Sequence, residues 1–250
     1  MMLKVERLRK IFGGRLVLDG VSFDLDAGER LGIVGRSGCG KSTLVKVIAR
    51  LLDADGGSIT FDGEDITRVT GGRLRAVYRK MQMIFQSPED SFNPRRTLGW
   101  SVGEPLRRWS MPNVEARVGE LLTAVGLPIE LAGRYPHEVS GGQCQRAAIA
   151  RALALEPKLL ICDEATSALD VRVQAQVTEL LRRLSVERGI ALLFITHNLA
   201  ILPALVERVM VMHDGRVVET GAVGDVIGRP QSEWTRELLA AEIFSTEEAD

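Results

Sequence analysis

The sequence predicts an α/β protein in which a helical segment interrupts a parallel α/β core. Three observations support this fold class. Short stretches within the first 65 positions alternate apolar and polar residues, as half-buried strands do. Other apolar runs lack alternation and stand beside helical patterns, as in a parallel sheet that is covered on both faces. Between about residues 86 and 157 the strand pattern is absent, and a helical pattern takes its place.

The N-terminal part combines half-buried strands with one strand, loop and helix unit. Apolar residues alternate with polar ones over positions 21–25 and 59–61, which predicts strands with one buried face. The run 31–34 is apolar throughout, so we expect a strand that is buried on both faces. A glycine-rich loop follows it, and a helical pattern extends over 41–50.

The remaining elements are a helical segment, two buried strands and a hairpin. Apolar residues over 114–125 fall on one helical face. Strand character returns at 159–162 and 191–196, and a helical pattern lies between these runs. Asp214-Gly215, flanked by alternating valines, predicts a tight β-hairpin, and we expect the acidic C-terminus to fray.

Composition excludes several classes of function. The 250 residues carry a formal net charge of −1, which provides no overall basic field for a nucleic-acid backbone. The longest apolar run, 190–195, is far shorter than the roughly 20 residues of a membrane-spanning helix. The N-terminus lacks the apolar stretch of a signal peptide, so we expect a cytosolic chain. The three cysteines and three histidines are too scattered to predict a disulfide framework or a metal cluster.

The glycine-rich loop matches the phosphate-binding P-loop pattern in the structural context that this pattern requires. Its glycines let backbone N–H groups face phosphate oxygens, Lys41 adds a cation, and the Ser42 hydroxyl can bind Mg²⁺. We therefore expect ATP to be bound with Mg²⁺. The residues predicted to contact the nucleotide here are Gly35, Arg36, Ser37, Gly38, Cys39, Gly40, Lys41, Ser42 and Thr43.

Two carboxylates end the apolar run 159–162. Asp163 is predicted to hold Mg²⁺, directly or through water, and Glu164 to act as general base on the attacking water. Two acids after a strand are by themselves more often a solvated strand end. The P-loop in the same chain favours the catalytic interpretation.

The segment Val139-Ser140-Gly141-Gly142-Gln143, followed by an Ala-rich helix, resembles the signature sequence of ABC-type ATPases. Ser140 and the glycines at a helix N-terminus make a second anion site, and Ser140, Gly141, Gly142 and Gln143 are expected to contact nucleotide. Ser140 precedes Asp163 by 23 residues and His197 follows it by 34, as in that family. The resemblance covers about residues 3–226.

The resemblance implies roles for four further residues. Gln86 corresponds to the Q-loop glutamine, which senses Mg²⁺ and the membrane partner, and His197 to the switch histidine that contacts the γ-phosphate. Asp170 lies in Ser167-Ala168-Leu169-Asp170, which is similar to the D-loop, and Phe12 corresponds to the aromatic that stacks on adenine. Read alone, the four would be a surface amide, a strand end, a helix cap and a core side chain.

The resemblance also implies a fold and its parts. It predicts a P-loop NTPase (RecA-like) core with an N-terminal antiparallel β subdomain and an inserted α-helical signature subdomain. The ATPase domain is expected over 1–225, with the core at about 1–85 and 158–225, the helical subdomain at about 86–157, and a short tail at 226–250.

The segment 85–95, with Asn93-Pro94-Arg95, looks like that of importers of the peptide and nickel branch. The implied partners are transmembrane permease subunits, a second ATPase subunit that is either a copy of this chain or a sister chain, and indirectly an extracytoplasmic substrate-binding protein. The implied location is the cytoplasmic face of the membrane. The ending without a cysteine after Cys162, together with residues 194–197 and 209–215, is similar to the second ATPase of nickel-type importers. Nickel or a metal–chelator complex is therefore preferred to peptides, and both stay open. The alternative class is a soluble ABC ATPase of DNA repair or translation.

Overall fold

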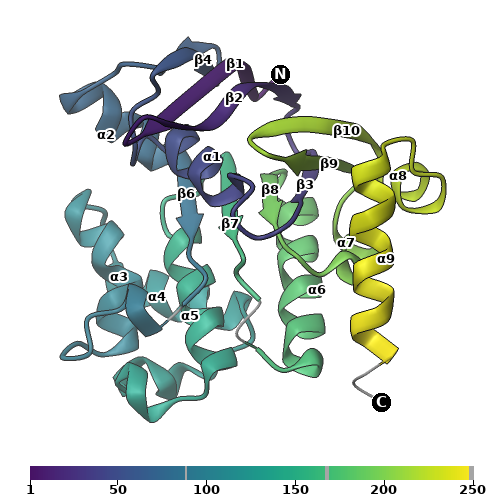
Figure 1. Ribbon diagram of the computed structural model, residues 1–250. Coiled ribbons are helices and arrows are strands. Elements are labelled where there is room, and N and C mark those ends of the chain that lie inside the picture. The colour runs from purple at the N-terminus through teal and green to yellow at the C-terminus, as the bar shows by residue number, and fades with distance from the viewer. Residues whose placement is uncertain (88, 167–168, 248–250) are drawn as a thin grey trace.

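The computed structural model describes residues 1–87, 89–166 and 169–247, and its strands form two sheets. The smaller, antiparallel sheet has the order β2-β1-β4-β5 and lies at the top of Figure 1. The larger sheet has the order β10-β9-β3-β8-β7-β6, and it is parallel except for β10. The strands are β1 Leu3–Phe12, β2 Arg15–Leu25, β3 Arg30–Val34, β4 Gly56–Phe61, β5 Glu64–Asp65, β6 Met81–Ile84, β7 Leu159–Asp163, β8 Ala191–Ile195, β9 Arg208–His213 and β10 Arg216–Ala222.

The described residues between β6 and β7 form only helices and loops, and Figure 1 shows α3, α4 and α5 grouped away from the antiparallel sheet. The helices of the chain are α1 Lys41–Ile48, α2 Gly71–Lys80, α3 Leu98–Arg108, α4 Val114–Ala124, α5 Gly141–Leu153, α6 Val171–Arg188, α7 Leu202–Leu205, α8 Val223–Gly228 and α9 Glu233–Glu247, with 3₁₀ turns at Glu89–Ser91, Ile129–Gly133, Pro136–Glu138 and Leu199–Ile201. None of those described is long and apolar enough to span a membrane.

Local chemistry explains where the helices that carry the site begin and end. The Asp170 carboxylate accepts a hydrogen bond from Val173 N at 3.0 Å and caps the start of α6. Gly189, in the left-handed conformation, ends that helix. Ser140 caps α5 in the same way, through a 3.3 Å bond from Gln143 N.

The central strands are buried on both faces, as their continuous apolar runs predict. Alternate residues of β7 and β8 contribute to two different core clusters: Cys162 and Phe194 belong to the one that includes the α3–α6 side chains, and Ile161 and Leu193 to the one beneath the antiparallel sheet. The predicted α/β class is thus confirmed. Because β3, β7 and β8 are parallel neighbours, the loops that follow them meet at one edge of the sheet.

Candidate functional site

The P-loop, residues 35–43, joins β3 to α1 and depends on glycines at two close approaches. Gly35 has φ +152°, and a Cβ there would lie 2.2 Å from Met212 O. Gly40, with φ +106°, would place a Cβ 2.9 Å from Val17 O. Side chains do not fit at either position, so the backbone of β9 and β2 can press against the loop.

Lys41 is buried in this loop. Its ammonium donates hydrogen bonds to Gly35 O at 2.7 Å and to Arg36 O at 3.1 Å. The loop is held from outside by Gly215 N, which donates to Cys39 O at 3.0 Å. A single cation is thus enclosed by the loop that begins α1, an arrangement suited to phosphate oxygens.

Ser42 and Asp163 come together at the edge of the sheet, although 121 residues separate them. The Ser42 hydroxyl donates to Asp163 Oδ1 at 2.9 Å. Burial raises the pKa of the Asp163 carboxyl above its usual value, while the Ser42 hydrogen bond and the cations Lys46 and Lys41 act in the opposite direction. Oxygen ligands in this setting fit a small hard cation such as Mg²⁺.

Glu164 and His197 form a second pair beside the first. Glu164 Oε2 lies 3.9 Å from His197 Nδ1. Glu164 has φ +49°, and its N–H donates to Ile195 O at 3.1 Å, so the backbone after β7 is tied to the end of β8. A left-handed non-glycine residue costs about 1–3 kcal/mol of backbone strain and is often found at active sites.

Ser140 and Gln143 lie apart from these pairs. At the start of α5, each of the two side chains accepts a hydrogen bond from the backbone N–H of the other residue. Ser140 N donates to Gln143 Oε1 at 3.0 Å. Within residues 1–87, 89–166 and 169–247, no hydrogen bond or ion pair links the side chain of either residue to the P-loop. The P-loop and the start of α5 therefore lie in different parts of the chain, and the binding of nucleotide by Ser140 and Gln143 stays a prediction.

The other predicted site residues that the structure describes, Gln86, Phe12 and Asp170, are exposed at the surface. Gln86 is exposed, two residues after β6. Phe12, at the end of β1, is 45% exposed, and Lys10 Nζ lies 5.1 Å from its ring centroid. Asp170 caps α6 in addition to any role in nucleotide binding. Ser167 and Ala168 of the predicted D-loop, like Pro88, are outside the described residues.

Sequence reasoning missed the contacts that helix α9 makes with the P-loop region. Arg36 pairs with Glu237 of α9 at 3.2 Å. His213 stacks on Trp234, with ring centroids 3.6 Å apart and planes at 13°. Both pairs join different elements of the chain, and Arg36 and Glu237 are 201 positions apart, so no local pattern could have predicted them. Residues 226–250, expected only as a tail, therefore include a helix that reaches the loop.

Cys39 lies inside the P-loop as a buried free thiol. Burial raises the pKa of its thiol, despite the nearby Lys41 ammonium, so the group stays protonated near neutral pH.

Residues 18–167 match the family described as ABC transporter. The chain belongs to the ABC transporter family. As an ABC ATP-binding domain, it has the P-loop, the carboxylates that end β7 and the capped α5 helix described above, and its predicted fold and family are confirmed.

Similar proteins include ATP-binding proteins of importers. The glutathione import ATP-binding protein GsiA of Pectobacterium atrosepticum is 50% identical over 224 residues, which are 88% of this chain and 36% of GsiA. The oligopeptide transport ATP-binding protein OppF of Escherichia coli (strain K12) is 48% identical over 228 residues, 90% of this chain and 68% of OppF. The chain thus spans about a third of the length of GsiA.

Two solved structures share this ABC fold closely. The ATP-binding cassette MJ0796, in a dimeric post-hydrolysis state bound to ADP and Pi, has a TM-score of 0.80 and 30% identity, covering 89% of this chain and 99% of that one. CbiO1 from Clostridium perfringens, part of the ABC transporter complex cbiONQ, has a TM-score of 0.84 and 29% identity, covering 99% and 98%.

Proposed function

We propose that this chain hydrolyses ATP to power uptake through a membrane permease. The observation that carries this proposal is the meeting of three loops at the edge of the parallel sheet, where Lys41 and the Ser42–Asp163 pair lie on one side and Glu164 and His197 on the other. Cation, hydroxyl, carboxylates and imidazole are the groups that phosphoryl transfer to water requires.

Each residue has a proposed task. Lys41 and the amides at the start of α1 bind the β- and γ-phosphates of ATP, and Phe12 stacks on adenine. Ser42 and Asp163 would hold Mg²⁺, with Gln86 beside them, and the ion supplies neutralising charge to the phosphate oxygens when bound. A Glu164 carboxylate oxygen takes the proton of the attacking water as the bond from the β–γ bridging oxygen to the γ-phosphorus breaks, and His197 orients the γ-phosphate.

A complete site is proposed to need a second chain. We infer an anion site at the start of α5, formed by Ser140, Gly141, Gly142 and Gln143. Ser140 and Gln143 bond to each other there, and in the part of the chain that the structure describes neither side chain bonds to the P-loop. We propose that it closes over the nucleotide of a partner, with Asp170 at the contact. The dimeric post-hydrolysis state of the similar cassette MJ0796 supports this arrangement.

The cargo is proposed to be a peptide or a peptide-like molecule. The relatives OppF and GsiA are named for oligopeptide transport and glutathione import. Nickel, which the sequence analysis preferred, has no counterpart in these names, whereas the peptide alternative has. They also favour an importer at the cytoplasmic face of the membrane, served by an extracytoplasmic binding protein, over a soluble ATPase of DNA repair or translation.

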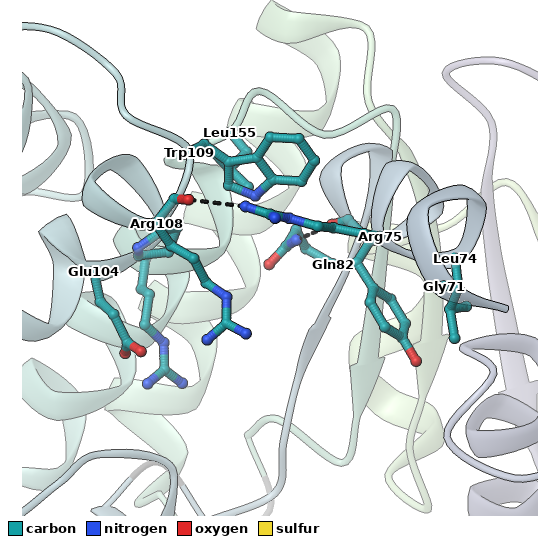
Figure 2. A pocket seen from close by; sticks show the side chains of 11 residues that line it. Gly71, Leu74, Arg75, Gln82, Glu104, Arg108, Trp109 and Leu155 are labelled. Carbon is teal, nitrogen blue, oxygen red and sulfur yellow. Dashed lines mark hydrogen bonds between the residues drawn. The ribbon is translucent and has the colours of Figure 1, made fainter.

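The permease is proposed to dock in a groove between α2 and α3. This groove, a cavity of about 470 Å³, is lined by Gly71, Leu74, Arg75, Tyr78, Gln82, Glu104, Pro105, Arg108, Trp109, Arg151 and Leu155 (Figure 2). Three of these residues are arginines and one is a glutamate, so the groove favours an acidic cytoplasmic segment. Gln82, which lines the groove, is four residues before Gln86 in the chain, and this proximity in sequence supports a connection between the proposed docking surface and the proposed Q-loop.

Substitution of Glu164 tests the proposal. We expect Glu164→Gln to bind ATP with normal affinity and to hydrolyse it at least 100-fold more slowly, because the amide keeps the shape of the side chain but cannot accept the proton. Lys41→Ala is the complementary variant, which should lose tight ATP binding. Fluorescent-nucleotide titration and phosphate release measure the two effects. Full turnover in Glu164→Gln would move the base to another residue.

A further inference from the structure

The buried amide of Gln174 lies between the two segments that carry the proposed catalytic pair. Gln174 is in the first turns of α6, and its Nε2 donates to Thr166 Oγ1 at 3.2 Å. Its Oε1 accepts from Asn198 Nδ2 at 3.4 Å. Thr166 follows Glu164 by two residues, and Asn198 is the neighbour of His197. One side chain therefore links both segments, because an amide donates and accepts at the same time.

The Asn198 end of this link is fixed independently. Asn198 N donates to Thr196 Oγ1 at 3.0 Å, and Asn198 Oδ1 accepts from Ala200 N at 2.9 Å. Thr196 is itself buried. His197 thus projects from a turn whose two flanking residues are held in place, although its own side chain is 61% exposed.

The Thr166 end is equally enclosed. Thr166 is 2% exposed and Gln174 is 8% exposed, so neither can replace a lost partner with bulk water easily. A buried polar group left unpaired costs about 1–3 kcal/mol, which is enough to shift the segment that carries it. If Gln174 only filled space in this core, an apolar side chain would serve equally well. Its hydrogen bonds to Thr166 and Asn198 instead fix how the two loops lie relative to each other.

The first turn of α6 is also where the signature helix packs. A Cβ at Gly142 would lie 2.6 Å from Val173 Cγ1, and one at Gly141 would lie 3.7 Å from Leu169 Cδ2. Val173 is the residue before Gln174 and binds the Asp170 cap. A displacement of the start of α5 therefore reaches Gln174 through a single close contact.

We propose that Gln174 is a positioning residue for ATP hydrolysis. It sets the separation of Glu164 and His197, and it connects that pair to the signature segment through Val173. The start of α5 is the part of the chain proposed to meet the partner's nucleotide. Formation of the shared site can therefore change the positions of Glu164 and His197 through Val173 and Gln174. The inference rests on the proposed function, and it adds a residue that acts through Thr166 and Asn198.

Gln174→Met tests this role, since methionine has a similar length and can neither donate nor accept strongly. We expect kcat for ATP hydrolysis to fall at least tenfold while KM for ATP stays within twofold, because the nucleotide contacts are intact and the catalytic geometry is not. Gln176→Met is the matched control, because Gln176 is an exposed glutamine in the same helix and accepts a hydrogen bond from Arg146 instead. It should keep kcat within twofold.

A double-mutant cycle separates positioning from loss of stability. Thr166→Val and Asn198→Ala should each lower kcat, and each combined with Gln174→Met should be no worse than the more affected single variant. The proposal would be overturned if the losses of kcat in the single variants multiplied in the double variants. It would also be overturned if the losses of kcat followed the melting temperature alone. So would a Gln174→Met enzyme with wild-type kcat. If the wild-type chain hydrolysed no ATP, the proposed function itself would fail, and the two failures are therefore distinguishable. Where Gln174→Met does not fold, the Thr166→Val and Asn198→Ala variants carry the same test.

Discussion

Asp62, outside the proposed nucleotide site, forms ion pairs with two lysines from different parts of the chain. Its carboxylate accepts from Lys158 Nζ at 2.8 and 2.9 Å and from Lys80 Nζ at 2.7 Å. Asp62 follows β4 in the antiparallel sheet, Lys80 ends α2, and Lys158 precedes β7. One side chain therefore ties the N-terminal sheet to the parallel core.

We predict that Asp62→Asn lowers the free energy of unfolding by about 0.5–1 kcal/mol at pH 7, a modest effect because both lysines are largely exposed to solvent. Hydrogen bonds from Lys158 and then Lys80 hold the pKa of Asp62 below its usual value. The contribution is therefore present above the unfolded pKa of about 3.9 and is lost as pH falls through the lower folded value. Urea unfolding from pH 7 to below pH 4 measures it.

The control for this prediction is Glu64→Gln, two residues on, because Glu64 has no ion pair among the described residues. It should leave the unfolding free energy unchanged within about 0.5 kcal/mol. A difference between wild type and Asp62→Asn that stayed constant down to acid pH would show that the carboxylate charge contributes nothing.

At the scale of elements, cation–π contacts join α2 to the end of α3 across the groove. Arg75 and Arg79 supply the cations and Trp109 the ring. The Arg75 and Arg79 guanidinium groups lie 4.7 and 5.4 Å from the Trp109 ring centroid. Arg75 also donates to Arg108 O at 2.9 Å, the dashed contact of Figure 2. Such contacts are worth about 0.5–1 kcal/mol each when exposed, so an acidic partner side chain could compete for these cations.

We predict that Arg75→Glu weakens association with the permease at least several-fold, because it places a negative charge where an acidic segment docks. The measurement is the membrane-bound fraction of the tagged chain in cells that produce it naturally, followed by photo-crosslinking from position 74. ATP affinity of the variant should not change.

Arg68→Glu is the matched control for the groove, since Arg68 is an exposed arginine outside it. It should leave the membrane-bound fraction at the wild-type level. Equal loss in both variants would indicate a non-specific charge effect, and no loss in either would reject the groove as the docking surface.

The elements that sequence predicted are those with a strong local pattern. Strand β8 is apolar throughout, β3 is apolar after its first residue, and β7 is apolar up to its last residue. The hairpin of β9 and β10 turns at Asp214-Gly215. Strand β6 has only four residues, and α2 begins with two glycines and buries only Val77. Neither pattern is long enough to recognise. The packing of α9 on the P-loop depends on pairs such as Arg36 with Glu237, 201 residues apart.

The candidate site follows the same division. Motif spacing predicted which residues would gather, because the loops after parallel strands must meet at one edge. It could not predict the Ser42–Asp163 hydrogen bond, the left-handed backbone of Glu164 or the Gln174 link, since these depend on side-chain packing between loops. The roles of Phe12, Gln86 and Asp170 remain predictions.

At the scale of the whole molecule, the two anion sites belong to different parts of the chain. Lys41 and Ser42 start α1 against the parallel sheet, whereas Ser140 starts α5 in the helical group. Ser140 and Gln143 are paired with each other at the surface of their own helix. The two halves of the proposed site are therefore apart in one chain, so the proposal requires either a large rearrangement or a second chain.

We predict that a second chain completes the site. Glu164→Gln, which should retain ATP, is expected to form dimers in ATP and Mg²⁺ and to be monomeric without them, as light scattering can measure. Adding Ser140→Arg should preserve ATP binding and abolish these dimers, because the larger cation would occupy space that the partner's γ-phosphate needs.

The same change would remove the Ser140 cap of α5, at a cost of about 1 kcal/mol. Ser140→Ala separates the two effects, since it also loses the cap but leaves the space open and should still dimerise, though less strongly. Dimers of the Ser140→Arg, Glu164→Gln chain that matched those of Glu164→Gln would place the shared site elsewhere.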